Sequence, residues 1–123
     1  MKKLFIYFTS LIAIYFISMN GVASDAEIID VKAELNAAQK FNISVTLKHD
    51  DTGWEHYANA WRIYSPDGML IAERVLHHPH VKEQPFTRNL LAVSIPADIS
   101  EIFIAAVCSN TGESEKRYTL KLR

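Results

Sequence analysis

Apolar and polar residues alternate along three segments of the chain, at residues 29–35, 41–48 and 118–123. The apolar positions are Ile29, Val31, Ala33 and Leu35 in the first segment, Phe41, Ile43, Val45 and Leu47 in the second, and Tyr118, Leu120 and Leu122 in the last. A period of two is typical of a β-strand whose sheet has one buried face and one face in water. We therefore predict a strand in each segment.

Four less regular segments separate these strands. Residues 57–64 and 69–76 flank Ser65-Pro66-Asp67-Gly68, in which proline, aspartate and glycine each suit their position in a β-turn, and this predicts a hairpin. Residues 86–95 form a further predicted strand that Pro96 ends. Residues 101–109 are apolar on both faces, as expected of a central strand, and residues 110–113 then turn the chain into the last strand.

Seven short strands, frequent turns and no long amphipathic helix predict an all-β domain. The pattern favours a single antiparallel β-sandwich of immunoglobulin-like type. Trp61 is expected to be the large core residue of its strand. Cys108 is the only cysteine, so it cannot form a disulfide within its own chain, and we expect it to pack as a small buried hydrophobe.

The first 24 residues have the three parts of a secretory signal peptide. Lys2 and Lys3 give a positive start, residues 4–19 are almost wholly apolar, and residues 20–24 are mostly small. We predict cleavage after Ser24, with cleavage after Ala26 as the alternative. The mature domain is then residues 25–123, in the periplasm or outside a bacterial cell, with no stable membrane span. No cysteine lies near the junction, which argues against a lipid anchor.

The charge of the mature chain argues against nucleic acid as a partner. Without Lys2 and Lys3, eleven Lys and Arg stand against fourteen Asp and Glu, a formal charge of −3. No basic face is suggested by this balance. An unidentified protein or small ligand is the expected partner.

All five histidines lie between residues 49 and 80. His78 and His80 are two residues apart around Pro79, a spacing that sends both imidazoles to one side of an extended chain, with His77 on the other side. Two such imidazoles are half of a zinc or copper site. His56, His49 and Glu83 are the candidate third ligands, with His56 preferred; structural, hydrogen-bonded histidines are the alternative.

Asp51-Thr52-Gly53 has the triplet that carries the catalytic carboxylate of aspartic proteases. Here a polar stretch precedes the triplet, Trp54 follows it, and no glycine-rich flap is found. We interpret it as an acidic turn between two strands, with Gly53 at positive φ. No other catalytic motif is present, so we expect a protein that is not an enzyme and needs no cofactor, unless it binds zinc or copper.

The middle of the chain resembles a family of small exported bacterial proteins of uncharacterised function. The resemblance rests on the blocks at residues 53–58, 61–62, 66–68, 74–80 and 83–88, in this order and spacing. It implies a shared fold and a shared site within residues 49–88, but no reaction. Two hypotheses follow. The first is a non-enzymatic binding module that uses Trp54, His56, His77, Glu83 and Arg88; the second is a zinc- or copper-binding protein that uses His78, His80 and a third ligand.

Overall fold

The computed structural model describes residues 25–123, so the predicted signal peptide lies outside the described residues. This part of the chain is all-β and contains no helix, which confirms the predicted class. Its eight strands are β1 (Glu27–Leu35), β2 (Phe41–Lys48), β3 (Ala58–Tyr64), β4 (Leu70–Val75), β5 (Phe86–Val93), β6 (Glu101–Cys108), β7 (Gly112–Glu113) and β8 (Tyr118–Lys121). No helix within residues 25–123 is long and apolar enough to cross a membrane.

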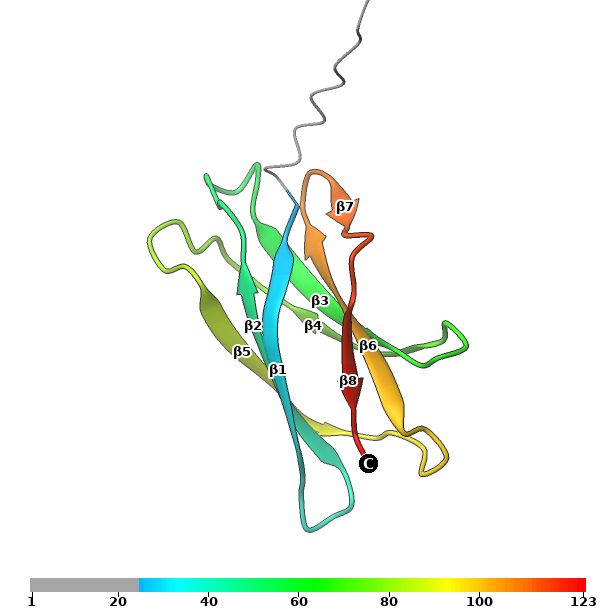
Figure 1. The fold of residues 1–123 in the computed structure, drawn as a ribbon. Helices are drawn as coiled ribbons and strands as arrows, with labels where there is room; N and C mark the ends of the chain where they lie inside the picture. The colour runs from blue at the N-terminus through cyan, green and yellow to red at the C-terminus, as the bar shows by residue number, and fades with distance from the viewer. Residues whose placement is uncertain (1–24) are drawn as a thin grey trace, which may run out of the picture.

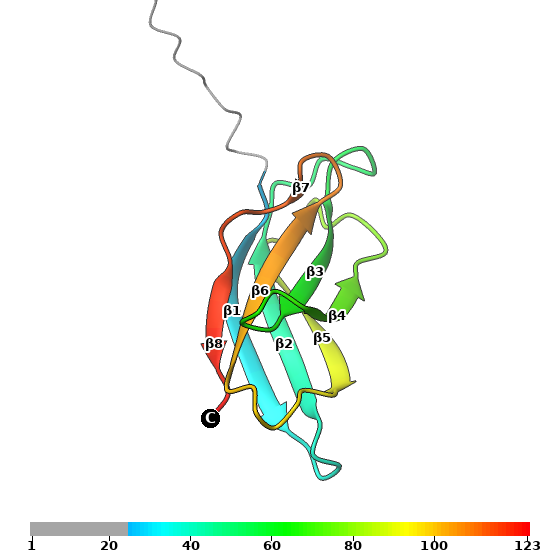
Figure 2. The same cartoon turned by 90° about the vertical axis from the view of Figure 1, so that its right-hand side faces the viewer.

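The strands form two antiparallel sheets. One sheet has the order β1-β2-β5, and the other has the order β4-β3-β6-β7, with β8 also paired to β6 (Figure 1). The two sheets pack as two layers, and in Figure 2 the sheet that contains β3 and β6 lies in front of the sheet that contains β1, β2 and β5. The buried apolar residues of both sheets form one continuous core, to which β2, β3 and β6 contribute most.

The core confirms the alternation read from the sequence for β2. Phe41, Ile43, Val45 and Leu47 are all buried, while the residues between them are partly exposed. Trp61 of β3 has an exposed fraction of 0%, as predicted for the large core residue of that strand. Cys108, at the end of β6, is buried, also as predicted.

Three details of the strand prediction were wrong. Leu35, the last apolar position of its segment, is 49% exposed because it lies at the end of β1. Ile29 is exposed rather than buried, because the β1–β2 register shifts between Ile28 and Asp30 and turns the partly buried Ile28 towards the core instead. Such a bulge exchanges the faces of the residues before it. Gly112 and Glu113, expected only to turn the chain, form the short strand β7 beside Val107 and Cys108.

The predicted hairpin between β3 and β4 is present. The Ser65 N–H donates to the Met69 carbonyl, and the Gly68 N–H donates to the Ser65 carbonyl. Gly68 has a φ of 88°, a conformation that glycine adopts without the steric cost that a β-carbon brings.

The chain segments that carry the histidines meet at one end of the molecule. β2 ends beside the start of β5, where Leu47 faces Phe86, and β3 begins beside the end of β6, where Ala58 faces Cys108. The β2–β3 and β4–β5 connections and the end of β6 therefore lie together, at the top of Figure 1.

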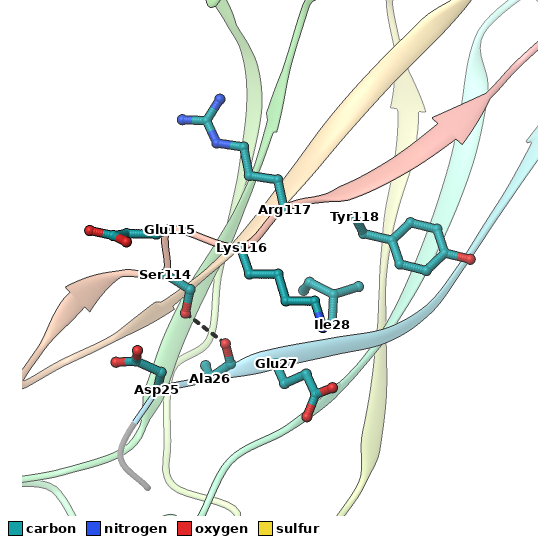
Figure 3. Close-up of a pocket in the computed structure, with 9 residues that line it drawn as sticks. All are labelled: Asp25, Ala26, Glu27, Ile28, Ser114, Glu115, Lys116, Arg117 and Tyr118. Atoms are coloured by element: carbon teal, nitrogen blue, oxygen red, sulfur yellow. Dashed lines mark hydrogen bonds between the residues drawn. The ribbon is translucent and has the colours of Figure 1, made fainter. Parts of the chain in front are cut away.

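A pocket of about 460 Å³ lies between the start of β1 and the β7–β8 connection, lined by residues 25–28 and 114–118 (Figure 3). Inside it the buried Ser114 hydroxyl donates to the Ala26 carbonyl at 2.6 Å. None of the histidines or Cys108 lines this pocket.

Candidate metal centre

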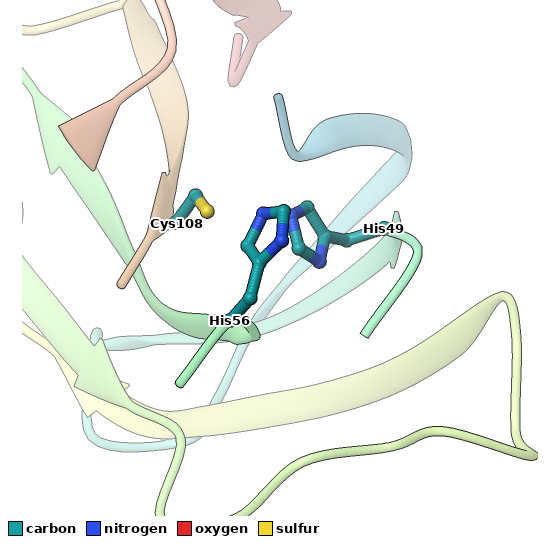
Figure 4. A group of neighbouring side chains, drawn as sticks. All are labelled: His49, His56 and Cys108. Carbon is teal, nitrogen blue, oxygen red and sulfur yellow. The ribbon is translucent and has the colours of Figure 1, made fainter. Parts of the chain in front are cut away.

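His49, His56 and Cys108 bring three metal-ligating side chains together. One ligand atom from each lies within 4.8 Å of the other two, and Figure 4 shows the three side chains pointing towards one another. His49 follows β2, His56 precedes β3, and Cys108 ends β6. His49 and Cys108 are buried, and His56 is partly buried with its Nε2 atom inaccessible to water and without a hydrogen-bond partner.

A short turn places His56. The His56 N–H donates to the Gly53 carbonyl at 3.1 Å, and the Thr52 N–H donates to the His56 carbonyl at 2.9 Å. Gly53 has a φ of 153°, which confirms the predicted positive φ at this residue. The turn folds the chain back after β2, so that the His49 and His56 rings meet edge to face with their centroids 4.8 Å apart.

Asp51 is the hydrogen-bonding centre of this end of the fold. Its Oδ1 accepts from His49 Nδ1 at 2.6 Å and from the Ala58 N–H at 3.0 Å, and its Oδ2 accepts from the His80 N–H at 2.7 Å. Its side chain is fully buried, as is that of His49. The triplet does join two strands, as interpreted, but its carboxylate is an internal acceptor rather than a surface charge.

The Cys108 thiol has a lowered pKa. Burial acts to raise that pKa, but hydrogen bonds from the Thr111 side chain and from the backbone of Thr111 and Asn110, with the charge of His49, outweigh burial and bring it from 9.0 to about 7. A thiolate is the form of cysteine that binds metals. The turn after β6 therefore favours the protonation state that coordination requires.

The connection between β4 and β5 is tied to the same centre. Gln84 accepts from the His49 N–H through Oε1 and donates to the His80 carbonyl through Nε2, both at 3.0 Å. The His80 ring stacks on Phe86 with centroids 4.0 Å apart. These contacts hold His80 in the protein, with an exposed fraction of 6%.

His78 and His80 lie side by side, as their spacing predicts, with ring centroids 4.8 Å apart. Arg88 donates to His80 Nε2 at 2.8 Å, which places a cation where a metal would bind. Burial, followed by the charges of Arg88 and His78, lowers the pKa of His80. Within residues 25–123, the three side chains close enough to hold a metal include His56 but neither His78 nor His80. Metal binding by His78 and His80 stays a prediction.

The other predicted surface residues are exposed to different degrees. Trp54 has an exposed fraction of 67% and contacts only the Tyr57 ring among the aromatic side chains described. His77 and Glu83 are exposed, and Glu83 forms an ion pair with Arg88 at 3.5 Å. Arg88 is partly buried because it lies over His80 and the Phe86 ring. A recognition role for these residues stays a prediction.

Sequence reasoning named His56 and His49 as possible ligands but missed Cys108. Its position in an apolar run indicated burial, which was right, and gave no sign that two histidines from another connection would lie beside it. The polar turn at residues 109–112 was the available signal, since N–H and hydroxyl groups there surround the sulfur.

One similar protein supplies a comparison. The chain is 35% identical over 65 residues to a protein of Halomicrobium mukohataei described as a "putative lipoprotein". The match covers 53% of this chain but 32% of that protein, so the two differ greatly in length. No family model matches the chain, and no solved structure resembles it closely enough to extend the comparison.

Proposed function

We propose that this protein is an exported, non-enzymatic metal-binding module whose ligands are His49, His56 and Cys108. The observation that carries the proposal is the convergence of two imidazoles and one thiol within 4.8 Å. Imidazole and thiolate together suit zinc or copper. The site differs from the one that the His78–Pro79–His80 spacing predicted, although His56 belongs to both.

The distances are compatible with a metal after small side-chain movements. Three atoms no more than 4.8 Å apart share a point at most about 2.8 Å from each, against about 2.0–2.3 Å for zinc–nitrogen and zinc–sulfur bonds. Each side chain must therefore advance by at most about 0.5–0.8 Å, which small torsional rotations supply. The unpartnered His56 Nε2 and the thiol with a lowered pKa both gain a partner in this way.

The hydrogen bonds and burial of Asp51 also support a structural rather than a catalytic role for this residue. Its two carboxylate oxygens accept three hydrogen bonds from the protein itself, and its side chain has no exposed surface. A protease carboxylate must reach a substrate and a water molecule. The resemblance to the aspartic-protease triplet is therefore coincidental in this proposal.

The export and class of the domain belong to the same proposal. A signal peptide at residues 1–24 delivers residues 25–123 to the periplasm or the medium, where they form an immunoglobulin-like sandwich. Two findings support this proposal. One sheet has the order β1-β2-β5 and the other the order β4-β3-β6 with β8 beside β6, and the chain is similar to a protein described as a lipoprotein. The formal charge of −3 on the mature chain argues against nucleic acid.

Metal analysis of untagged protein tests the proposal. Wild-type protein is expected to take up one zinc or copper ion per chain and to melt at a higher temperature when the metal is in excess, since the metal binds the folded state. Cys108→Ser should abolish both effects. His77→Ala, which removes an exposed histidine outside the group, is the matched control and should retain them.

The double variant His78→Ala/His80→Ala distinguishes the two sites. Retained metal uptake in this variant, with loss in Cys108→Ser, is the result that the structure favours. Loss in the double variant and retention in Cys108→Ser would instead establish the pair around Pro79 as the site. Uptake by neither metal in the wild-type protein would end the proposal.

A further inference from the structure

Asp51 lies beside the three ligands. Its carboxylate holds the orientation of the His49 ring and adds a negative charge to that of a metal-binding Cys108 thiolate. Its Oδ1 lies 2.6 Å from His49 Nδ1, which must donate because the carboxylate can only accept. His49 therefore presents Nε2, and not Nδ1, as its metal ligand. A carboxylate that holds a ligating histidine in this way fixes the tautomer and makes the imidazole a better ligand.

The charges around the group balance a divalent ion. Metal binding requires Cys108 as a thiolate, and with the Asp51 carboxylate it would place two negative charges in a buried region, where an uncompensated charge is costly. A monovalent copper ion would leave one negative charge unbalanced. A zinc(II) ion would leave none.

Divalent copper fits the ligands less well. A blue-copper centre combines two histidines and a cysteine with a weak axial ligand, most often methionine. Met69 is the only methionine in residues 25–123, and it follows the far end of β3, whose seven residues extend about 20 Å from the His56 end. It cannot reach the group, so copper(II) would need one of the less common axial ligands, a glutamine or backbone oxygen.

We propose that the centre binds zinc(II), with His49 coordinating through Nε2 and Asp51 acting as a positioning residue that also balances the charge. This inference rests on the proposed function. A fourth ligand would come from solvent, as in zinc sites with three protein ligands. The same Asp51 also anchors the β4–β5 connection through the His80 N–H, so the zinc ligand and that connection share one carboxylate.

Competition titrations with zinc(II) and copper(I) on the full mature chain test the charge argument. Asp51→Asn should weaken zinc binding by about 10–100-fold, the usual effect of losing such an outer carboxylate. Copper(I) binding should weaken less, because the variant removes the surplus negative charge. Asp50→Asn, which changes the neighbouring exposed carboxylate, should leave both affinities unchanged.

No loss for either metal in Asp51→Asn would overturn the role of Asp51, and equal losses for the two metals would overturn its charge-balancing role. A variant that merely loosens the fold, or only frees the His49 ring, would weaken both metals alike, so the ratio of the two affinities isolates the effect of the charge.

Nitrogen chemical shifts of the histidine rings provide a measurement that needs no variant. In wild-type protein loaded with zinc, His49 should show a metal-bound Nε2 and a protonated Nδ1. Binding through Nδ1, or a His49 that does not bind zinc, would refute the inference while leaving metal binding intact. Uptake of copper(I) without zinc would refute the zinc assignment alone, whereas uptake of neither would refute the proposed function itself.

Discussion

Replacing Asp51 with alanine should destabilise the metal-free protein more than any other single change to a charged residue at this end of the fold. The carboxylate accepts hydrogen bonds from His49 Nδ1, the Ala58 N–H and the His80 N–H, and its side chain is fully buried. Alanine would leave these three donors without an acceptor in a region that bulk water does not reach.

The magnitude follows from the number of donors. A buried donor that loses its partner costs about 1–3 kcal/mol, so three of them cost about 3–9 kcal/mol. A domain of this size is stable by about 5–15 kcal/mol in total. Even the lower value should reduce Tm by at least about 12 °C, at about 4–8 °C for each kcal/mol.

Urea unfolding in the presence of a chelator, followed by tryptophan fluorescence, measures this loss without interference from metal. Asp50→Ala is the matched control, because Asp50 is the adjacent carboxylate and is exposed. It should change the free energy of unfolding by less than about 0.5 kcal/mol. If Asp51→Ala lost less than about 1 kcal/mol, Asp51 could not be the buried hydrogen-bonding centre described here.

Three further predictions concern other parts of the molecule. Phe86→Ala should cost about 3–5 kcal/mol in urea unfolding, because it removes a buried ring and the surface on which His80 stacks, whereas Leu91→Ala, at an exposed position of the same strand, should cost far less. Burial and nearby cations lower the pKa of His80 below its usual 6.5, so near and below that pH the folded state binds fewer protons than the unfolded state. The free energy of unfolding should therefore decrease as the pH is lowered from above about pH 6.5. His80→Gln should flatten that dependence between about pH 8 and about pH 5 in chemical unfolding, and an unchanged slope would contradict the assignment. Mass spectrometry of protein exported from cells should find Asp25 as the first residue; a chain that still begins at Met1 would contradict cleavage.

The strands could be predicted from the sequence because burial of one sheet face imposes a period of two on neighbouring residues. Residues 41–48 show this most clearly, and they form β2 with the expected faces. The faces at the start of β1 could not be predicted, because the bulge between Ile28 and Asp30 arises from pairing with β2 and leaves no local mark in the sequence.

The sequence by itself determined the all-β class, the burial of Trp61 and Cys108, and the stretch that supplies the histidines. Only the tertiary structure decided which side chains meet there. His78 and His80 are neighbours through local geometry, which sequence spacing reveals. His49, His56 and Cys108 are neighbours because β2 and β6, in different sheets, end at the same end of the core. Cys108 is 52 or more positions from both histidines, and a contact over such a separation has no periodic signature.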